Sequence, residues 1–255
     1  MNILETIQQK LDEIEQKEHV RILHAVESGS RAWGFASPDS DYDVRFIYVR
    51  REEDYLRLGK QRDVIEWQLD ETLDINGWDL QKALRLMYGS NPTLFEWCDS
   101  PVVYRTTDLW QNISEQGRVY FSERAGFQHY LSMAKHTYQA YLTGETVRLK
   151  KYFYCLRPVL ACRWIQSRHS IPPVAFHTLA ESMLPDELRD IVSGLVEQKM
   201  QTSELGANPR IPLLHDYLEH SLTELTQEAA EIPPASDKEW TLLDRLFLET
   251  VRAGC

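Results

Sequence analysis

The sequence predicts an α+β fold, in which a small mixed β-sheet domain is followed by an all-α helical domain. Up to about residue 105, short apolar runs of strand type alternate with helical patterns. Beyond that point apolar residues repeat at helical spacing, and glycines and prolines mark the helix ends. A chain of 255 residues is long enough for two small domains. We therefore expect one domain at residues 1–105 and a second at residues 106–255.

The first domain is expected to begin with an amphipathic helix, because Ile3, Leu4, Ile7, Leu11 and Ile14 fall on one side of a helix. Apolar runs bounded by turn residues then predict four strands. A helix follows the last strand, and a second, short helix starts with Asn as N-cap and Pro at the first helical position. The strands are expected at residues 20–27, 43–50, 63–69 and 72–77, and the helices from Trp78 to Gly89 and from Asn91-Pro92 onward.

The second domain is expected to consist of helices separated by Gly144 and by prolines, which end or start helices. Cys155 and Cys162 lie seven residues apart on one of these helices, a spacing typical of core packing. The helices are expected at residues 107–118, 123–143, 146–167, 185–201, 211–229 and 237–252.

Composition excludes several classes of protein. The formal net charge of -11 argues against a protein that coats nucleic acid, although it leaves room for a local basic site. The sequence has no run near the roughly 18 apolar residues that a membrane-spanning helix needs. The first residues lack the positive start and apolar run of a signal peptide, so we expect a cytoplasmic protein. Four cysteines without CxxC pairs predict reduced thiols.

The segment from Glu27 to Tyr48 carries the chemistry. Gly29-Ser30 follows a strand directly, where glycine allows close backbone approach and free amides can bind a phosphate. Asp41 and Asp43 then share one face of the next strand, because side chains alternate along a strand. Adjacent carboxylates repel unless they are solvated or bridged by a cation, and hard oxygen ligands suit Mg²⁺ or Mn²⁺. The alternative is a plain turn followed by surface acids.

This order of strand, Gly-Ser, short helix and Asp-x-Asp resembles the DNA polymerase beta-like nucleotidyltransferases. Within that superfamily, GSRAWGFASPDSDYDVRFIYV (residues 29–49) is similar to a bacterial and phage family of predicted nucleotidyltransferases that includes members linked to RNA repair. LDINGWDLQKAL and NPTLFEWCDSPVVY extend the resemblance over residues 20–105. KKYFYCLRPVLACRW carries it into the helical half.

The resemblance implies a metal site of three carboxylates. Asp41 and Asp43 would bind both catalytic Mg²⁺ or Mn²⁺ ions, and the superfamily usually has a third carboxylate on a later strand. Asp74 is the expected third ligand, which would hold the catalytic ion and help to deprotonate the incoming hydroxyl. Glu66, on the preceding strand, and Asp79, at the start of the helix, are the competing candidates.

Two arginines near these acids are candidate nucleotide ligands. Arg45 lies on the same strand face as Asp41 and Asp43, where it could orient a carboxylate or bind a phosphate. An ordinary salt bridge with Asp43 explains Arg45 equally well. Arg31 directly follows Ser30, so it could meet a triphosphate; a solvated arginine in a first helical turn is the alternative. Gly29, Ser30, Arg31 and Arg45 are therefore the expected nucleotide contacts of the first domain.

A basic segment is the second candidate binding region. Residues 146–180 contain no acid, although the chain as a whole is acidic. An apolar stripe from Leu149 to Trp164 predicts the buried side of a helix. Another side would carry basic and tyrosine side chains suited to a triphosphate or an RNA end, and a merely solvated basic face is the alternative. The candidate contacts are Lys150, Lys151, Tyr154 and Arg157.

Together these features predict an enzyme that transfers a nucleoside monophosphate from an NTP to a hydroxyl group and releases pyrophosphate. The acceptor could be an RNA end, a protein side chain or a small molecule, and the resemblance favours RNA. Two alternatives keep the same fold: a nucleotide-binding regulatory protein without turnover, and an antitoxin-like interaction module. Intact Gly29-Ser30 and Asp41-x-Asp43 motifs favour the enzyme.

Overall fold

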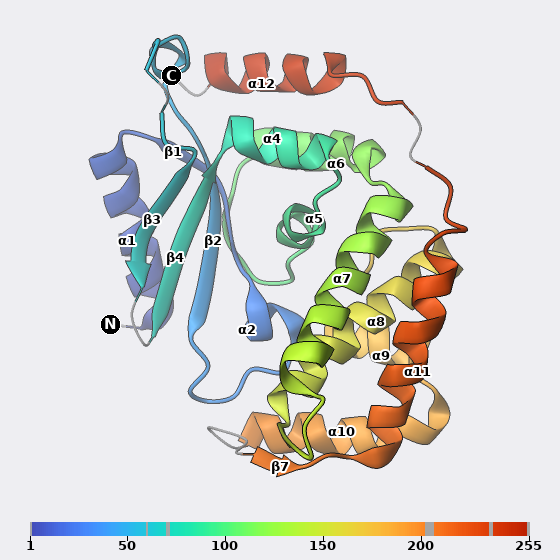
Figure 1. The fold of residues 1–255 in the computed structure, drawn as a ribbon. Helices are drawn as coiled ribbons and strands as arrows, with labels where there is room; N and C mark the ends of the chain where they lie inside the picture. The colour runs from blue at the N-terminus through green and yellow to red at the C-terminus, as the bar shows by residue number, and fades with distance from the viewer. Residues whose placement is uncertain (1, 60, 70–71, 202–206, 235–236, 254–255) are drawn as a thin grey trace. The chain divides into compact units, whose positions relative to one another are not determined.

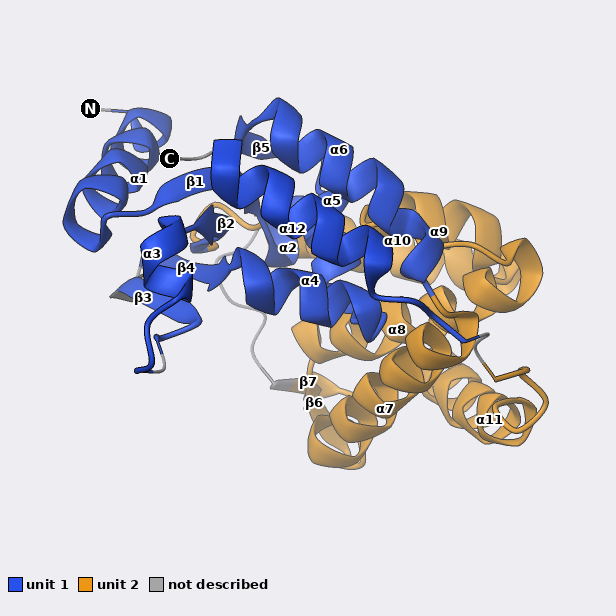
Figure 2. Ribbon diagram, turned by 90° about the horizontal axis from the view of Figure 1, so that it is seen from above, with its two compact units in different colours: residues 1–32, 41–121, 237–255 blue, residues 33–40, 122–236 orange. Residues whose placement is uncertain are grey.

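The chain forms two compact units, coloured separately in Figure 2. The computed structural model describes residues 2–59, 61–69, 72–201, 207–234 and 237–253 (Figure 1). Unit 1 comprises residues 1–32, 41–121 and 237–255, and unit 2 comprises residues 33–40 and 122–236. These limits differ from the expected division at residue 105, because residues 106–121 and the last helix group with the sheet. A functional division of the chain at that point stays a prediction.

Unit 1 is built on a five-stranded sheet with the strand order β3-β4-β2-β1-β5. β2 and β4 pair in parallel, whereas the other neighbours are antiparallel. The mixed sheet confirms the predicted α+β class, and the four expected strands lie within two residues of their predicted ends. β5 was not expected. The strands are β1 (Arg21–Glu27), β2 (Tyr42–Val49), β3 (Val64–Leu69), β4 (Leu73–Asp79) and β5 (Val103–Thr106).

The first helix covers one face of this sheet (Figure 1). The Asn2 side chain caps the start of the helix, and the Glu5 side chain accepts the Asn2 N–H in return, as in a capping box. Ile7, Leu11 and Ile14 are buried against alternate residues of the strands, as the sequence predicts, whereas Leu4 near the helix start is 51% exposed. Asp43 and Arg45 alternate with the β2 residues of this core, so they lie on the opposite face.

The remaining helices of unit 1 follow the sheet in sequence. α4 starts at Leu80 rather than at Trp78, because Asp79 is still part of β4 and caps the helix by accepting the Gln81 N–H. Asn91 caps the short helix that begins with Pro92, as expected. The helices are α1 (Ile3–Glu18), α2 (Gly29–Trp33), α3 (Glu52–Tyr55), α4 (Leu80–Tyr88), α5 (Pro92–Cys98), α6 (Asp108–Gly117) and α12 (Thr241–Ala253), with a short 3₁₀ turn η1 (Arg118–Tyr120).

Unit 2 is helical, with one small two-stranded ribbon. The single helix expected at residues 146–167 is instead a strand followed by a helix from Lys150, because Thr146 and Val147 pair with residues near Pro209. The predicted apolar stripe is buried at Leu149 and Phe153. α9 was not expected. The elements are α7 (Glu123–Tyr141), β6 (Thr146–Arg148), α8 (Lys150–Arg168), α9 (Phe176–Met183), α10 (Asp186–Gln201), β7 (Ala207–Pro209) and α11 (Pro212–Glu228).

Within the described ranges, no helix has both the length and the apolar character required to cross a membrane. Cys98, Cys155 and Cys162 are free thiols, as the sequence predicts for these three. Burial raises the pKa of the Cys155 thiol to about 12, which favours the unreactive protonated form.

His24 connects β1 to β5 and α5 inside unit 1. Its ring is 4% exposed and stacks on Trp110, with the centroids 5.4 Å apart. Nε2 lies 3.1 Å from the Trp97 carbonyl, which can only accept, so Nε2 carries the proton and Nδ1 accepts from the Thr106 hydroxyl. Burial lowers the pKa of His24 to about 4, since charging the ring would remove solvation that the protein does not replace.

We expect His24 to make unit 1 less stable in mild acid. Its pKa is lower in the folded chain than in the unfolded chain, so the stability it contributes is complete above about pH 6.5 and is lost as the pH falls toward 4. His24→Gln keeps one donor and one acceptor but does not titrate. Between pH 7 and 5, the free energy of unfolding measured in urea should fall less steeply with pH in the variant than in wild type, by up to about 1.4 kcal/mol per pH unit. The exposed His136→Gln should keep the pH dependence of wild type. The same pH dependence in His24→Gln and wild type would contradict the role given to His24.

Candidate active site

The Gly-Ser turn lies against Asp43. The Ser28 N–H donates to the Asp43 carbonyl at 2.9 Å, so β1 and β2 stay joined up to the turn. Gly29 then adopts a φ of +62°, which glycine tolerates best. A Cβ on Gly29 would lie 2.1 Å from Asp43 Oδ2. Because Gly29 has no Cβ, the turn and the Asp43 carboxylate can touch.

Asp43 and Asp74 lie side by side on neighbouring strands. The parallel register of β2 and β4 pairs Asp43 directly with Asp74. Arg45 Nη2 donates to Asp43 Oδ1 at 2.9 Å and to Asp74 Oδ2 at 2.6 Å. Its Nη1 donates to the Asp74 carbonyl at 2.8 Å. Arg45 thus forms the anticipated salt bridge with Asp43 and extends it to the third predicted acid.

Asp41 lies one residue before β2 and is exposed. Its carbonyl accepts a bond from Arg31 Nε at 3.0 Å, and the Arg31 guanidinium lies 3.7 Å from the Tyr42 ring centre. Counting only residues that the structure describes, no three His, Cys, Asp or Glu side chains are already grouped to hold a metal ion. The structure therefore brings together a carboxylate pair with an arginine counter-ion, and Asp41 stands at the edge of this pair.

The electrostatics around Asp43 reflect this crowding of acids. Burial raises the pKa of Asp43, and the negative charges of Asp41 and Asp74 raise it further. The Arg45 guanidinium opposes these effects. A divalent cation would relieve the same repulsion, and the carboxylate oxygens are ligands that Mg²⁺ and Mn²⁺ prefer. The donor chemistry at this site therefore fits such an ion.

The two competing acids lie elsewhere. Asp79 pairs with Tyr48 near the far end of β2, and its carboxylate accepts from the Gln81 N–H at 2.8 Å and the Tyr55 hydroxyl at 3.1 Å. Burial raises the pKa of Asp79 to about 6. Glu66 is exposed on β3, one strand further from Asp43. Asp74 is therefore the candidate that lies beside Asp43.

Glu27 is a residue of this site that sequence reasoning missed. It ends β1, is 1% exposed, and accepts the Asp43 N–H at 2.8 Å and a close bond from the Tyr104 hydroxyl. Burial raises the pKa of Glu27 to about 7, although the bonds from Tyr104 and from the Asp43 N–H counteract this. An acid at the end of the apolar run VRILHAVE is the feature that could have identified it.

The basic segment of unit 2 forms a less uniform surface than expected. Arg157 is 1% exposed, donates from Nε and Nη2 to the Val174 carbonyl at 3.3 Å, and lies 4.8 Å from the Trp33 ring centre. It therefore departs from the expected exposed face, because its tertiary neighbours surround it. Tyr154 is 38% exposed, and the Lys151 ammonium lies 5.4 Å from its ring centre. Nucleotide contacts by Lys150, Lys151, Tyr154 and Arg157 stay a prediction.

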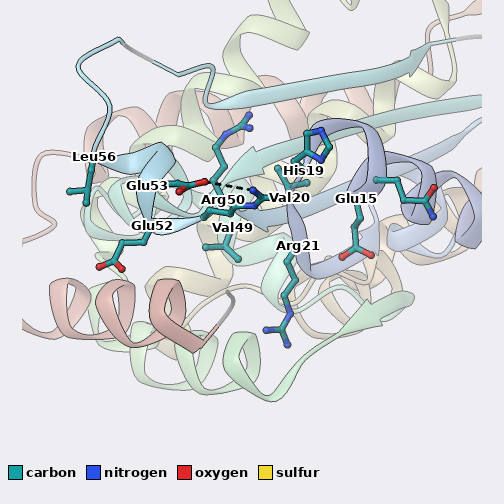
Figure 3. Close-up of a pocket in the computed structure, with 11 residues that line it drawn as sticks. Glu15, His19, Val20, Arg21, Val49, Arg50, Glu52, Glu53 and Leu56 are labelled. Carbon is teal, nitrogen blue, oxygen red and sulfur yellow. Dashed lines mark ion pairs between the residues drawn. The ribbon is translucent and has the colours of Figure 1, made fainter.

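A cavity of about 750 Å³ opens at the other end of the strands in unit 1 (Figure 3). Arg21 and Val49, which pair across β1 and β2, line it, whereas Glu27 and Val44 pair at the end next to the acids. Arg51 and Glu53, which both line this cavity, form an ion pair of 3.6 Å. This cavity of unit 1 is thus separate from the acids.

The chain belongs to the RNA repair pathway DNA polymerase beta family (RlaP), whose family model matches residues 3–249. It is 42% identical over 247 residues to the uncharacterized protein YcgL of Bacillus subtilis (strain 168), and the match covers 95% of this chain and 94% of that protein. A nucleotidyltransferase-like protein from Exiguobacterium sibiricum 255-15, known from a crystal structure, is 12% identical in sequence to this chain, and the two structures have a TM-score of 0.33. That comparison covers 99% of this chain and 77% of the other.

We expect Gly29→Ala to disturb Asp43 as well as the backbone. Gly34 also has a positive φ, of +88°, but a Cβ there would approach no atom closer than His177 Nδ1 at 4.0 Å. Each alanine should lower the free energy of unfolding by about 1–2 kcal/mol for the left-handed backbone. We expect Mn²⁺ and NTP to raise the melting temperature of wild type and Gly34→Ala but not of Gly29→Ala, because the added Cβ of Gly29→Ala displaces the Asp43 carboxylate. Equal responses of the two variants to Mn²⁺ and NTP would rule out a role for this contact.

Proposed function

We propose that this protein is a metal-dependent nucleotidyltransferase that moves a nucleoside monophosphate from an NTP to a hydroxyl acceptor and releases pyrophosphate. The main observation in support is that Asp43 pairs side by side with Asp74 and touches Gly29. Membership of a DNA polymerase beta family supports the same reaction class. In this reaction the acceptor oxygen forms a bond to the α-phosphorus while the bond to the bridging oxygen of pyrophosphate breaks.

The site residues divide into three roles in this proposal. Asp41, Asp43 and Asp74 would hold Mg²⁺ or Mn²⁺, and Asp74 would also help to take the proton of the attacking hydroxyl. The bound ion would neutralise phosphate charge and lower the pKa of that hydroxyl. Backbone amides at Gly29 and Ser30 would bind phosphate oxygens.

Arg31 and Arg45 would complete the binding of the triphosphate. Arg31 follows the turn, and its guanidinium can donate two parallel bonds to a phosphate. Arg45 now neutralises Asp43 and Asp74, and a metal ion that took its place on these acids would leave its guanidinium available to a phosphate. Lys150, Lys151, Tyr154 and Arg157 are proposed as contacts of unit 2 with the nucleotide or the acceptor, and Arg157, which is 1% exposed, would have to leave the Val174 carbonyl to make one.

An RNA end is the acceptor that we favour. The description of the family refers to an RNA repair pathway, and the acid-free stretch at residues 146–180 offers basic side chains to a phosphate backbone. The net charge of -11 disfavours a long nucleic-acid track, which is why we propose a single terminus rather than a duplex. The proposed setting is the cytoplasm, where reduced thiols are the rule.

Replacing the site acids should abolish ligand-induced stabilisation. At about 100 times its dissociation constant, a ligand that binds only the folded state stabilises it by about 2.7 kcal/mol. Wild type should therefore melt at a higher temperature with Mg²⁺ and the preferred NTP, and Asp43→Asn and Asp74→Asn should not. Glu66→Gln removes an exposed acid from β3 and should behave like wild type. Loss of the shift in Glu66→Gln with retention in Asp74→Asn would reverse the assignment of the third acid.

Transfer itself can be measured with α-labelled nucleotides. Wild type incubated with each labelled NTP, Mg²⁺ or Mn²⁺ and pooled tRNA should label RNA and release pyrophosphate, whereas Asp41→Ala/Asp43→Ala should do neither. Addition of whole-cell lysate in place of tRNA tests protein and small-molecule acceptors. If wild type transfers label to nothing with any of the four nucleotides but still gains stability from them, the non-catalytic nucleotide-binding alternative replaces the enzyme.

A further inference from the structure

We infer that Glu27 is a positioning residue that holds Asp43 in place for metal binding. The inference rests on the proposed function, since it assigns Glu27 to the support of a proposed metal ligand. Glu27 Oε1 accepts the Asp43 N–H at 2.8 Å, and the side chain is 1% exposed. A residue so deeply buried acts on a ligand through Asp43 rather than by touching it.

The fold creates the need for this contact. From His24 onward β1 and β2 pair in one antiparallel register up to Glu27 and Val44, and the next bond runs from the Ser28 N–H to the Asp43 carbonyl. The chain then turns at Gly29, where α2 begins. The Asp43 N–H faces the strand that has just ended, and the Glu27 carboxylate supplies an acceptor for it. An unpaired N–H at this point would cost free energy and loosen the start of β2.

Further contacts fix the Glu27 carboxylate itself. Its second oxygen accepts a bond from the Tyr104 hydroxyl on β5. The Glu27 carbonyl accepts from the Ser100 hydroxyl at 2.7 Å, and its N–H donates to the Val102 carbonyl at 2.9 Å. Both carboxylate oxygens are thus engaged, one by the site and one by the edge of the sheet. This arrangement matches the outer layer of a metal site, in which a ligand is held by hydrogen bonds to residues behind it.

A glutamine can make the same two bonds. Its carbonyl oxygen would accept the Asp43 N–H, and its amide would donate to the Tyr104 oxygen. Glu27→Gln therefore preserves the positioning and removes the charge, whereas Glu27→Ala removes both. Tyr104→Phe leaves the bond to Asp43 but releases the second anchor. These three variants separate positioning from a charge effect.

The test is the affinity for Mn²⁺ alone, measured by calorimetry on the full chain. Loss of an outer partner typically weakens metal binding about 10-fold to 100-fold, so Glu27→Ala should bind Mn²⁺ at least about tenfold more weakly than wild type. Glu27→Gln should stay within about threefold of wild type, and Tyr104→Phe should fall between the two. In the Glu27→Ala background, Tyr104→Phe should cause no further loss, because its effect passes through Glu27.

Glu15 provides a matched control in the same unit. Its Oε1 accepts the N–H of Ile22, at the other end of β1, at 2.7 Å, and its Oε2 accepts from Arg105 at 3.0 Å. Glu15→Ala thus removes the same kind of carboxylate-to-strand bond far from Asp43. It should lower the melting temperature and leave the Mn²⁺ affinity unchanged, which a general loosening of the sheet would not do.

Hydrogen exchange of the Asp43 amide tests the contact without metal. Exchange should be slow in wild type and Glu27→Gln, and at least about tenfold faster in Glu27→Ala. Unchanged protection or unchanged Mn²⁺ affinity in a folded Glu27→Ala would overturn the inference, as would a Glu27→Gln that binds as weakly as Glu27→Ala. If wild type binds no Mn²⁺, the metal site of the proposed function is wrong. Faster exchange of the Asp43 amide in Glu27→Ala than in wild type would then still support Glu27 as the residue that positions Asp43.

Discussion

The parallel pairing of β2 with β4 places Asp43 directly beside Asp74, and the candidate site depends on this pairing. Two buried or half-buried carboxylates at neighbouring positions repel each other, so the arrangement requires a cation. Arg45 supplies it here by donating from one nitrogen to both acids. A register shift of one residue would move Asp43 to the face packed by α1, and no site would form.

The connection between β2 and β4 explains how a parallel pair arises within so short a chain segment. Parallel neighbours need a crossover, and here α3 and β3 provide it before the chain returns as β4. β3 then pairs antiparallel with β4 and shields its outer edge. The acids consequently lie on the central strands β2 and β4, which are hydrogen-bonded on both sides and so hold their side chains in fixed directions.

The sequence was most informative where the relevant residues are close together in the chain. Gly29 and Asp43 could be recognised because turn and strand patterns are local, and the four longer strands have clear apolar runs. β5 was missed because most of its few residues are partly exposed, which leaves no apolar run. Contacts across many residues were also out of reach. The bond between Glu27 and the Asp43 N–H involves a backbone group, which no residue type reveals.

Helical periodicity failed at Arg157 for a related reason. Spacing along α8 shows which residues share a side of the helix, but tertiary neighbours decide whether that side is exposed. α9 was not predicted, and the segment before it supplies the carbonyl of Val174 that binds Arg157. Arg157 is therefore a buried structural element of unit 2, with its charge satisfied by a carbonyl and an aromatic ring.

Asp43 combines a fixed backbone with an exchangeable side-chain partner. Its N–H and carbonyl are held by Glu27 and Ser28, both at the end of β1, so the position of its Cα is set by the sheet. Its carboxylate instead binds Arg45, whose long side chain is 17% exposed and rotates more easily than a strand can move. A cation that replaced the guanidinium would find the carboxylate already in place. This division between a rigid main chain and a movable counter-ion is what a site needs if it is to bind and release a metal–nucleotide complex without unfolding the sheet.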